Sequence, residues 1–176
     1  MILRETPLAG AYVIELEELV DERGFFARTF DREIFERAGL RAGIVQSSVS
    51  YNRRRGTLRG MHFQAAPHEE TRRVGCTHGR IFDVIVDLRP DSATRHRWFG
   101  VELSAENRLQ LVIPEGFAHG FQTLEDDSLV HYDMSVPYAP AHARGYHHAS
   151  PAFAIDWPLP PIHVSERDQS LESLPR

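Results

Sequence analysis

The chain of 176 residues contains no lysine, so all 20 of its basic residues are arginines. This absence excludes Schiff-base catalysis, which needs a lysine amine. The formal net charge of -5 argues against a general nucleic-acid binder, because such proteins present a broad basic face to many phosphates. We therefore expect no nucleic-acid partner, and we expect any small anion to be held locally by a few arginines.

Cysteine and long apolar runs are also scarce. Cys76 is the single cysteine, which excludes an internal disulfide and predicts a buried, unreactive thiol. No segment approaches the roughly 18 consecutive apolar residues of a membrane span, and the first residues do not resemble a signal peptide. We expect a cytoplasmic protein without membrane association that forms one domain over residues 1–176.

The sequence does contain a series of short strand patterns. Alternating apolar residues predict strands over residues 80–89, 99–104 and 109–114, with turn residues between them. Short strands at this spacing are typical of an all-β sandwich or barrel. The best helix candidate spans residues 31–40, on the surface, and the proline-rich segment 157–168 is expected to lie extended over the barrel.

Side chains suited to chemistry gather in five segments, which are DERGFF (21–26), GTLRGMHFQ (56–64), PEGFAHGF (114–121), HYDMSVPY (131–138) and SERD (165–168). Taken singly, each has an ordinary structural explanation. A lone histidine on a strand is more often a satisfied structural group than a catalyst, and a lone tyrosine is more often core packing. The individual residues therefore do not decide the function.

In this order and spacing, the five segments resemble dTDP-4-dehydrorhamnose 3,5-epimerases along nearly the whole chain. The segments HGRIFDVIVDLRP, VELSAENRLQLVIPEGFAHGF and FAIDWP extend the resemblance, and the pairing of PEGFAHGF with GTLRGMHFQ is specific. The resemblance implies an all-β, cupin-type double-stranded β-helix, or jelly-roll, barrel with a few short peripheral helices. It also implies a homodimer that uses no metal and no organic cofactor.

The implied reaction inverts C3, C5 or both in a nucleoside-diphosphate 4-keto-6-deoxyhexose. By the resemblance, dTDP-4-dehydro-6-deoxyglucose would become dTDP-4-dehydrorhamnose. The 4-keto group acidifies the hydrogens on C3 and C5, so a base can remove one and an acid can return a proton to the opposite face. The resemblance makes His62 the base, Asp168 the carboxylate that orients it, and Tyr132 the acid.

The resemblance also implies a set of substrate-binding side chains. Arginine suits a diphosphate because its planar fork pairs with phosphate oxygens, so Arg23 and Arg59 are expected there, and Tyr138 is expected to stack on the nucleotide base. The full set is Arg23, Arg28, Gln46, Asn52, Arg59, Arg72, His119, Tyr138 and Arg167.

The resemblance raises a structural question about Arg59 and His62, which are three residues apart. A regular strand would place them on opposite faces, whereas a binding role requires both to face the barrel interior. Gly60 lies between them, and a bulge there would shift the register by one residue. We therefore predict a bulge at Gly60 and a polar barrel interior.

Several positions depart from the family pattern. Arg72 stands where a lysine is common, Arg28 where an acidic residue is usual, and Ala143 where a glutamate is common. The segment YHHASP replaces a tryptophan and an acidic pair, and Gln46 and Asn52 are alternative matches for polar residues before GTLRG. The base and acid are unchanged, so these departures concern the nucleotide, the sugar and the number of carbons inverted.

Three other interpretations stay open. A 3-epimerase or ketoisomerase acting on a related 4-keto sugar nucleotide would use the same enolate chemistry. A metal-dependent cupin would need a histidine and glutamate set, for which this chain offers only His62, Gln64, His68, Glu69 and His119. A non-catalytic sugar-nucleotide-binding cupin is the third, although the intact base and acid positions argue against it.

Overall fold

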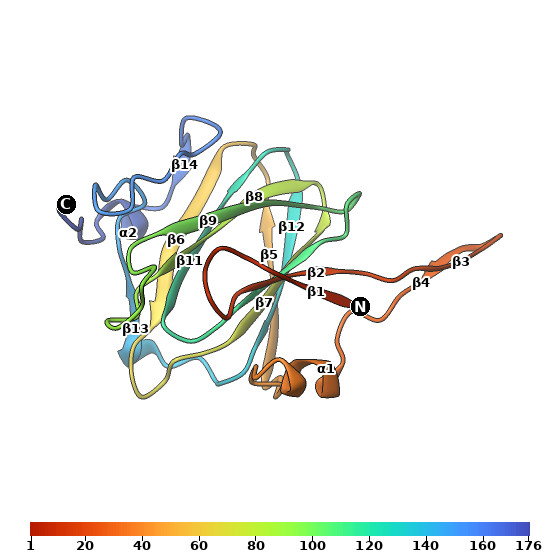
Figure 1. Cartoon of the computed structure of the whole chain (residues 1–176). Helices are drawn as coiled ribbons and strands as arrows, with labels where there is room; N and C mark the ends of the chain where they lie inside the picture. Colours follow the sequence, from red (N-terminus) through yellow and green to blue (C-terminus); the bar gives the residue numbers. More distant parts are fainter.

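Two sheets face each other and close into a barrel in the computed structural model, which describes residues 1–176 (Figure 1). The first sheet contains, in spatial order, β1 (Ile2–Glu5), β2 (Tyr12–Glu15), β10 (Gln110–Ile113), β7 (Arg72–His78), β12 (Ser128–Met134) and β5 (Gln46–Asn52). The second contains β13 (Ala143–Gly145), β6 (Thr57–Gln64), β11 (Phe117–Thr123), β8 (Arg80–Asp87) and β9 (Trp98–Ser104), and β14 (His163–Val164) pairs with β6. The expected strands at 80–89, 99–104 and 109–114 are confirmed.

Two strands leave the barrel altogether. β3 (Leu19–Asp21) and β4 (Gly24–Phe26) form a separate hairpin, which projects away from the barrel in Figure 1. Its apolar side chains are solvent-exposed, and they are Leu19, Val20, Phe25 and Phe26. We call residues 19–26 the arm.

Helices are few and short. α1 (Arg32–Arg37) begins where predicted, since the Asp31 side chain accepts hydrogen bonds from the backbone N–H groups of residues 33 and 34. The helix lies at the surface, yet Phe35 is buried in an apolar cluster with Ile14 and Val112. The 3-10 turn η1 (Pro140–His142) and α2 (Glu166–Gln169) complete the set, and no helix is long and apolar enough to cross a membrane.

The prediction of an extended C-terminal segment is only partly right. The segment pairs with β6 through β14, but residues 166–169 turn into helix α2. The cause is Ser165, whose hydroxyl accepts the backbone N–H of Asp168 and caps the helix. The turn buries the Asp168 side chain beside β6.

Alternation along the strands divides the barrel interior into two parts. One part is an apolar core that includes Val74, Cys76, Ile85, Phe121 and Val130. Toward one end of the barrel, the inward positions of the same strands become polar. Arg72 is the inward neighbour of Val74 on β7, Tyr132 is that of Val130 on β12, and His119 is that of Phe121 on β11. One half of the interior therefore stabilises the fold, and the other half is available for a ligand.

Cys76 behaves as the sequence predicted. Its side chain is buried in the apolar part of the barrel. Burial raises the pKa of the Cys76 thiol to about 11, so the reactive thiolate is scarce at neutral pH.

Candidate active site

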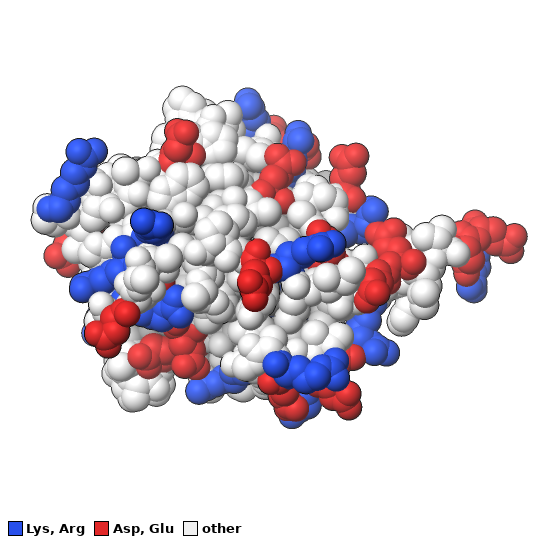
Figure 2. Space-filling model, viewed as in Figure 1, with Lys and Arg blue, Asp and Glu red and all other residues white.

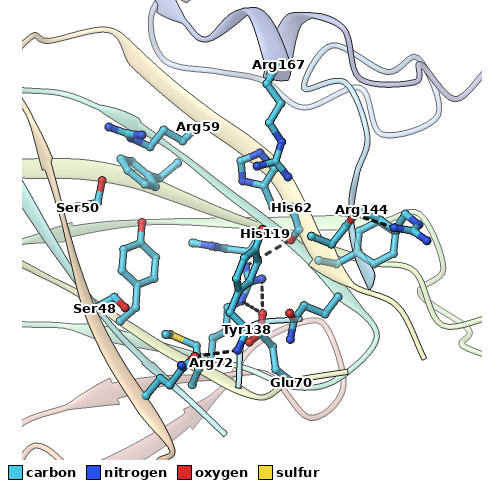
Figure 3. Close-up of a pocket in the computed structure, with 17 residues that line it drawn as sticks. Ser48, Ser50, Arg59, His62, Glu70, Arg72, His119, Tyr138, Arg144 and Arg167 are labelled. Carbon is cyan, nitrogen blue, oxygen red and sulfur yellow. Dashed lines mark hydrogen bonds and ion pairs between the residues drawn. The ribbon is translucent and has the colours of Figure 1, made fainter. Parts of the chain in front are cut away.

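The polar half of the barrel holds a cavity of about 320 Å³ that opens to solvent (Figure 3). Its walls come from both sheets and from α2. The lining residues are Gln46, Ser48, Ser50, Arg59, His62, Phe63, Gln64, Glu70, Arg72, His119, Phe121, Tyr132, Met134, Tyr138, Ala143, Arg144 and Arg167. Six of the predicted substrate-binding residues thus line one cavity together with the predicted base and acid.

The predicted bulge at Gly60 is confirmed. The pairing of β6 with β11 matches His62 with His119 but Arg59 with Phe121, so the register shifts by one residue between them. Gly60 has a φ of +133°, and a side chain there would place its Cβ 2.6 Å from the Cα of Gly120. The position therefore requires glycine, and the bulge allows both Arg59 and His62 to line the cavity.

His62 is held by Asp168 from behind the cavity wall. The Nε2 atom of His62 lies 2.7 Å from Oδ1 of Asp168, and the backbone N–H of Gly60 donates to the other carboxylate oxygen at 3.3 Å. Burial alone would raise the pKa of Asp168, but the hydrogen bond and charge of His62 outweigh it and hold this pKa below its usual value. The carboxylate therefore stays ionised at neutral pH, and Nδ1 of His62 is left for the cavity.

Tyr132 lies on the sheet opposite to His62, on β12 between β5 and β7. Burial raises the pKa of Tyr132 far above its usual value, and the negative charge of Asp83 acts in the same direction. Arg72 and Arg59 oppose this shift without cancelling it. The phenol consequently keeps its proton until a stronger base forms inside the cavity.

The cavity is rich in arginine, and two of its predicted members have no carboxylate partner. Arg59 donates from Nε to the amide oxygen of Asn52 at 2.8 Å, and Arg167 makes no ion pair. Figure 3 shows both at one end of the cavity, with Arg72 and Glu70 at the other. These cations are available to a phosphate group.

Arg72 is arranged differently, because its charge is already paired. Its Nε atom donates to Oε1 of Glu70 at 2.7 Å, and both side chains are mostly buried, at 16% and 8% exposed. A second guanidinium nitrogen also donates to Glu70, and a third donates to the backbone oxygen of His62 at 3.4 Å. The pair fixes the guanidinium beside the strand that carries His62.

Tyr138 and Gln46 form the rim of the cavity. The Gln46 side chain accepts the backbone N–H of Tyr138 at 2.8 Å, which anchors the loop after β12. Tyr138 is 57% exposed, so its ring is accessible to a ligand. Asn52, the other candidate for the ambiguous polar position, is buried behind Arg59 and does not line the cavity.

Two predicted substrate-binding arginines lie outside the cavity of this chain. Arg23 is at the tip of the arm, where it pairs with Asp21 and its side chain is 84% exposed. Arg28 pairs with Asp31 at the start of α1. Neither residue can contact a ligand bound in this cavity unless another copy of the chain brings it there.

Sequence reasoning missed Ser48, Ser50, Glu70 and Arg144, all of which line the cavity. Ser48 and Ser50 lie two and four residues after Gln46 on β5. Because every second residue of a strand points to the same side, they face the cavity together with Gln46. Glu70 has the same two-residue relation to Arg72. No local signal marks Arg144, whose side chain bonds only to the backbone oxygens of Ala141 and Ala143.

Of the set considered for a metal-dependent cupin, His62, Gln64 and His119 line the cavity, whereas His68 and Glu69 do not. His62 and His119 each face a carboxylate partner, and His68 packs on the ring of His142. No group of three histidine, cysteine, aspartate or glutamate side chains has the arrangement of a metal site.

A jelly-roll barrel with an arginine-rich cavity, a paired histidine and a facing tyrosine defines the class as cupin-type isomerases. The family model for dTDP-4-dehydrorhamnose 3,5-epimerase matches residues 5–175. The chain belongs to that family.

Individual relatives also support membership of this family. A dTDP-4-dehydrorhamnose 3,5-epimerase from Methanothermobacter thermautotrophicus is 43% identical over 97% of this chain and 92% of its own length. The crystal structure of the enzyme of that name from Elizabethkingia anophelis superposes with a TM-score of 0.95 at 37% identity, covering 98% of this chain and 96% of its own. The enzyme from Bacillus anthracis, with TDP and pyrophosphate bound, gives 0.94 at 39% identity over 98% and 99%.

The relatives do not all carry the same name. A protein from Streptomyces niveus that is 36% identical over 96% of this chain and 82% of its own length is called dTDP-4-dehydrorhamnose 3-epimerase. Membership of the family therefore establishes an isomerase of this type. It does not determine how many carbons are inverted, which depends on the active site.

Proposed function

We propose that the protein inverts both C3 and C5 of dTDP-4-dehydro-6-deoxyglucose, giving dTDP-4-dehydrorhamnose. One observation carries the proposal: His62 and Tyr132 reach the same cavity from facing sheets. Inversion requires a proton to leave one face of the sugar ring and another to arrive on the opposite face. Two proton-transfer groups on one wall could not do this.

In the proposed mechanism, Nδ1 of His62 removes the proton from C3 or C5 while Asp168 stabilises the imidazolium that forms. The electrons move to the C4 oxygen, which becomes an enolate. Tyr132 then delivers its proton to the far face of the same carbon. The high pKa of its phenol means that the proton is present when the enolate needs it.

The nucleotide is assigned to the open end of the cavity. Arg59 and Arg167 are free to bind the diphosphate there, and the exposed ring of Tyr138 is free to stack on the base. The Bacillus anthracis relative with TDP and pyrophosphate bound supports this class of ligand. The net charge of the chain is no obstacle, because Figure 2 shows that acidic and basic side chains are mixed over the face it displays.

The working form is proposed to be a homodimer in which each arm completes the other site. The arm exposes four large apolar side chains and carries Arg23 far from its own cavity. A second copy that covered the arm would bury this apolar surface, and it could bring Arg23 to a diphosphate.

Mixing two inactive variants tests the dimer. A chain with Arg23→Ala keeps its own base, and a chain with His62→Ala keeps its own arm. A mixed dimer would contain one complete site, so refolding the two together should restore about a quarter of wild-type activity. No recovery in a mixture that is demonstrably mixed would contradict arm exchange and leave the reaction itself untouched.

The direct test of the reaction is incubation with dTDP-4-dehydro-6-deoxyglucose in heavy water, followed by NMR. Deuterium at both C3 and C5, with inverted product, is the expected result. Deuterium at C3 alone would instead indicate the 3-epimerase that the Streptomyces niveus relative is named for. A shifted carbonyl would indicate a ketoisomerase, and binding without exchange would indicate a non-catalytic protein.

A further inference from the structure

The cavity contains a second histidine and aspartate pair that the mechanism above does not use. The Nε2 atom of His119, on β11, lies 2.7 Å from Oδ1 of Asp83, on the neighbouring strand β8. The pair is more deeply buried than the His62 pair, with side chains 4% and 0% exposed. His119 lines the cavity, and its ring centre is 6.1 Å from that of Tyr132.

Asp83 has an unusual environment for a carboxyl group. Its second oxygen, Oδ2, is buried and has no hydrogen-bond partner. On β8 its inward neighbours are Ile81 and Ile85, both in the apolar core. Burial raises the pKa of Asp83, and the opposing effects of His119 and Arg72 do not cancel the increase.

The charge of the pair decides which groups His119 offers to the cavity. If Asp83 is a carboxylate and His119 is neutral with its proton on Nε2, the pair has a net charge of -1 and Nδ1 is a hydrogen-bond acceptor. If the pair holds one more proton, its net charge is zero and Nδ1 carries a hydrogen. This holds whether the shared proton lies on Oδ1 or on Nε2.

The surroundings favour the neutral state. An isolated charge in an apolar interior is costly, and the bare Oδ2 atom leaves a carboxylate without the donors that usually stabilise it. Arg72, whose positive charge acts on Asp83, is already paired with Glu70, and Tyr132 and Cys76 nearby are uncharged at neutral pH. The pair therefore gains little from carrying a negative charge.

We propose that Asp83 is a positioning residue that holds His119 with a proton on Nδ1, so that His119 donates a hydrogen bond to the C4 oxygen as negative charge develops there. This inference rests on the proposed function. A preorganised donor aimed at a developing oxyanion accelerates related reactions by roughly 100- to 1000-fold. Arg72, whose charge is compensated by Glu70, would then share the task with His119.

The first test does not depend on activity. In protein labelled with ¹⁵N-histidine, with the His119 signals assigned by their loss in His119→Asn, Nδ1 of His119 should show the chemical shift of a protonated nitrogen at neutral pH. In Asp83→Leu the imidazole loses its hydrogen-bond partner, so the proton should no longer be held on Nδ1. An unprotonated Nδ1 in the wild-type protein would overturn the proposal even if the enzyme is fully active.

The second test measures turnover. Asp83→Leu should lower kcat by about 100-fold with little change in KM, because the lost interaction forms mainly in the transition state. Asp83→Asn can donate its amide N–H to Nε2 and so keep the proton on Nδ1, and it should recover at least a tenth of the wild-type kcat. Equal losses in the two variants would contradict the positioning role.

Asp87→Asn is the matched control, since Asp87 is a buried aspartate on the same strand outside the cavity. It should reduce stability while leaving the kcat of the folded protein close to wild type. If no variant and no wild-type protein acts on the dTDP sugar, the proposed function fails, and the ¹⁵N measurement still decides the protonation of His119.

Discussion

Nε2 of His62 and Oδ1 of Asp168 lie 2.7 Å apart although 106 positions separate the two residues in the chain. The contact forms because Ser165 caps α2 and because the bulge at Gly60 turns a backbone N–H toward the second carboxylate oxygen. The histidine is therefore oriented by two elements that share no local sequence.

This relationship predicts the effect of Asp168→Asn. The variant should bind the sugar nucleotide normally but exchange the C3 and C5 hydrogens roughly 100-fold more slowly, because the imidazolium loses its stabilising charge. Calorimetric binding and deuterium exchange in heavy water measure the two effects separately. Exchange at the wild-type rate would make Asp168 a structural residue.

Tyr132→Phe separates removal of a proton from its return. The variant keeps His62, so deuterium should still enter the substrate from the face of the base, while inverted product accumulates slowly. NMR of the recovered sugar reports both quantities in one sample. An unchanged yield of epimer would remove Tyr132 from the role of acid.

Arg72 tests whether a compensated cation contributes to the reaction. Guanidinium and ammonium both carry the charge that stabilises an enolate, so Arg72→Lys should keep at least a tenth of the rate, with the ratio of C3 to C5 exchange unchanged. Arg72→Ala should lose most of the activity and leave Glu70 without its partner. Glu70→Gln is the control for the loss of the ion pair alone.

The opposite result would also be informative. If Arg72→Lys changes which carbon exchanges, or acts on the dTDP sugar much faster than wild type, Arg72 determines specificity. The natural substrate would then be a different 4-keto sugar nucleotide.

Asp87 stabilises the turn after β8. It accepts bonds from the Arg89 guanidinium and from the hydroxyls of Ser92 and Thr94, and it is fully buried. Because Arg89 remains one-third exposed, we expect Asp87→Asn to lower the free energy of unfolding by about 2 to 3 kcal/mol, below the range for a fully buried pair. Urea denaturation monitored by tryptophan fluorescence measures this difference.

The same residue predicts a pH dependence. Burial would raise the pKa of Asp87, but the bonds from Arg89, Ser92 and Thr94 outweigh it and place this pKa well below its usual value. Its stabilisation is therefore complete above the unfolded-state pKa of about 4 and is lost as the pH falls toward the folded-state value. The gap between wild type and Asp87→Asn should shrink below about pH 4, and a constant gap would contradict this account.

Much of the barrel and the core of the site could be predicted from the sequence. Alternation locates β8, β9 and β10, because one face of each strand packs into the core. The poor alternation around Gly60 points to a bulge. The family resemblance then assigns His62 and Tyr132, whose local sequence alone does not distinguish them from structural residues.

The remaining features depend on contacts between distant segments. Helix α2 forms at the end of a proline-rich segment because one serine caps it, whereas the composition of the segment favours an extended chain. The hydrogen-bond partner of His119 is Asp83, which lies 36 positions away on a neighbouring strand. Arg23 lies on an arm that projects from the barrel, so its proposed contact with a diphosphate requires a second copy of the chain.

The most direct test of the account is deuterium exchange by His62→Ala. The variant should remain folded, with an unchanged unfolding transition and unchanged nucleotide binding, because His62 lines a cavity and is not part of the apolar core. It should show no exchange at C3 or C5 in heavy water under conditions where wild type exchanges both. Exchange near the wild-type rate in the folded variant would show that His62 is not the base and would contradict the central claim.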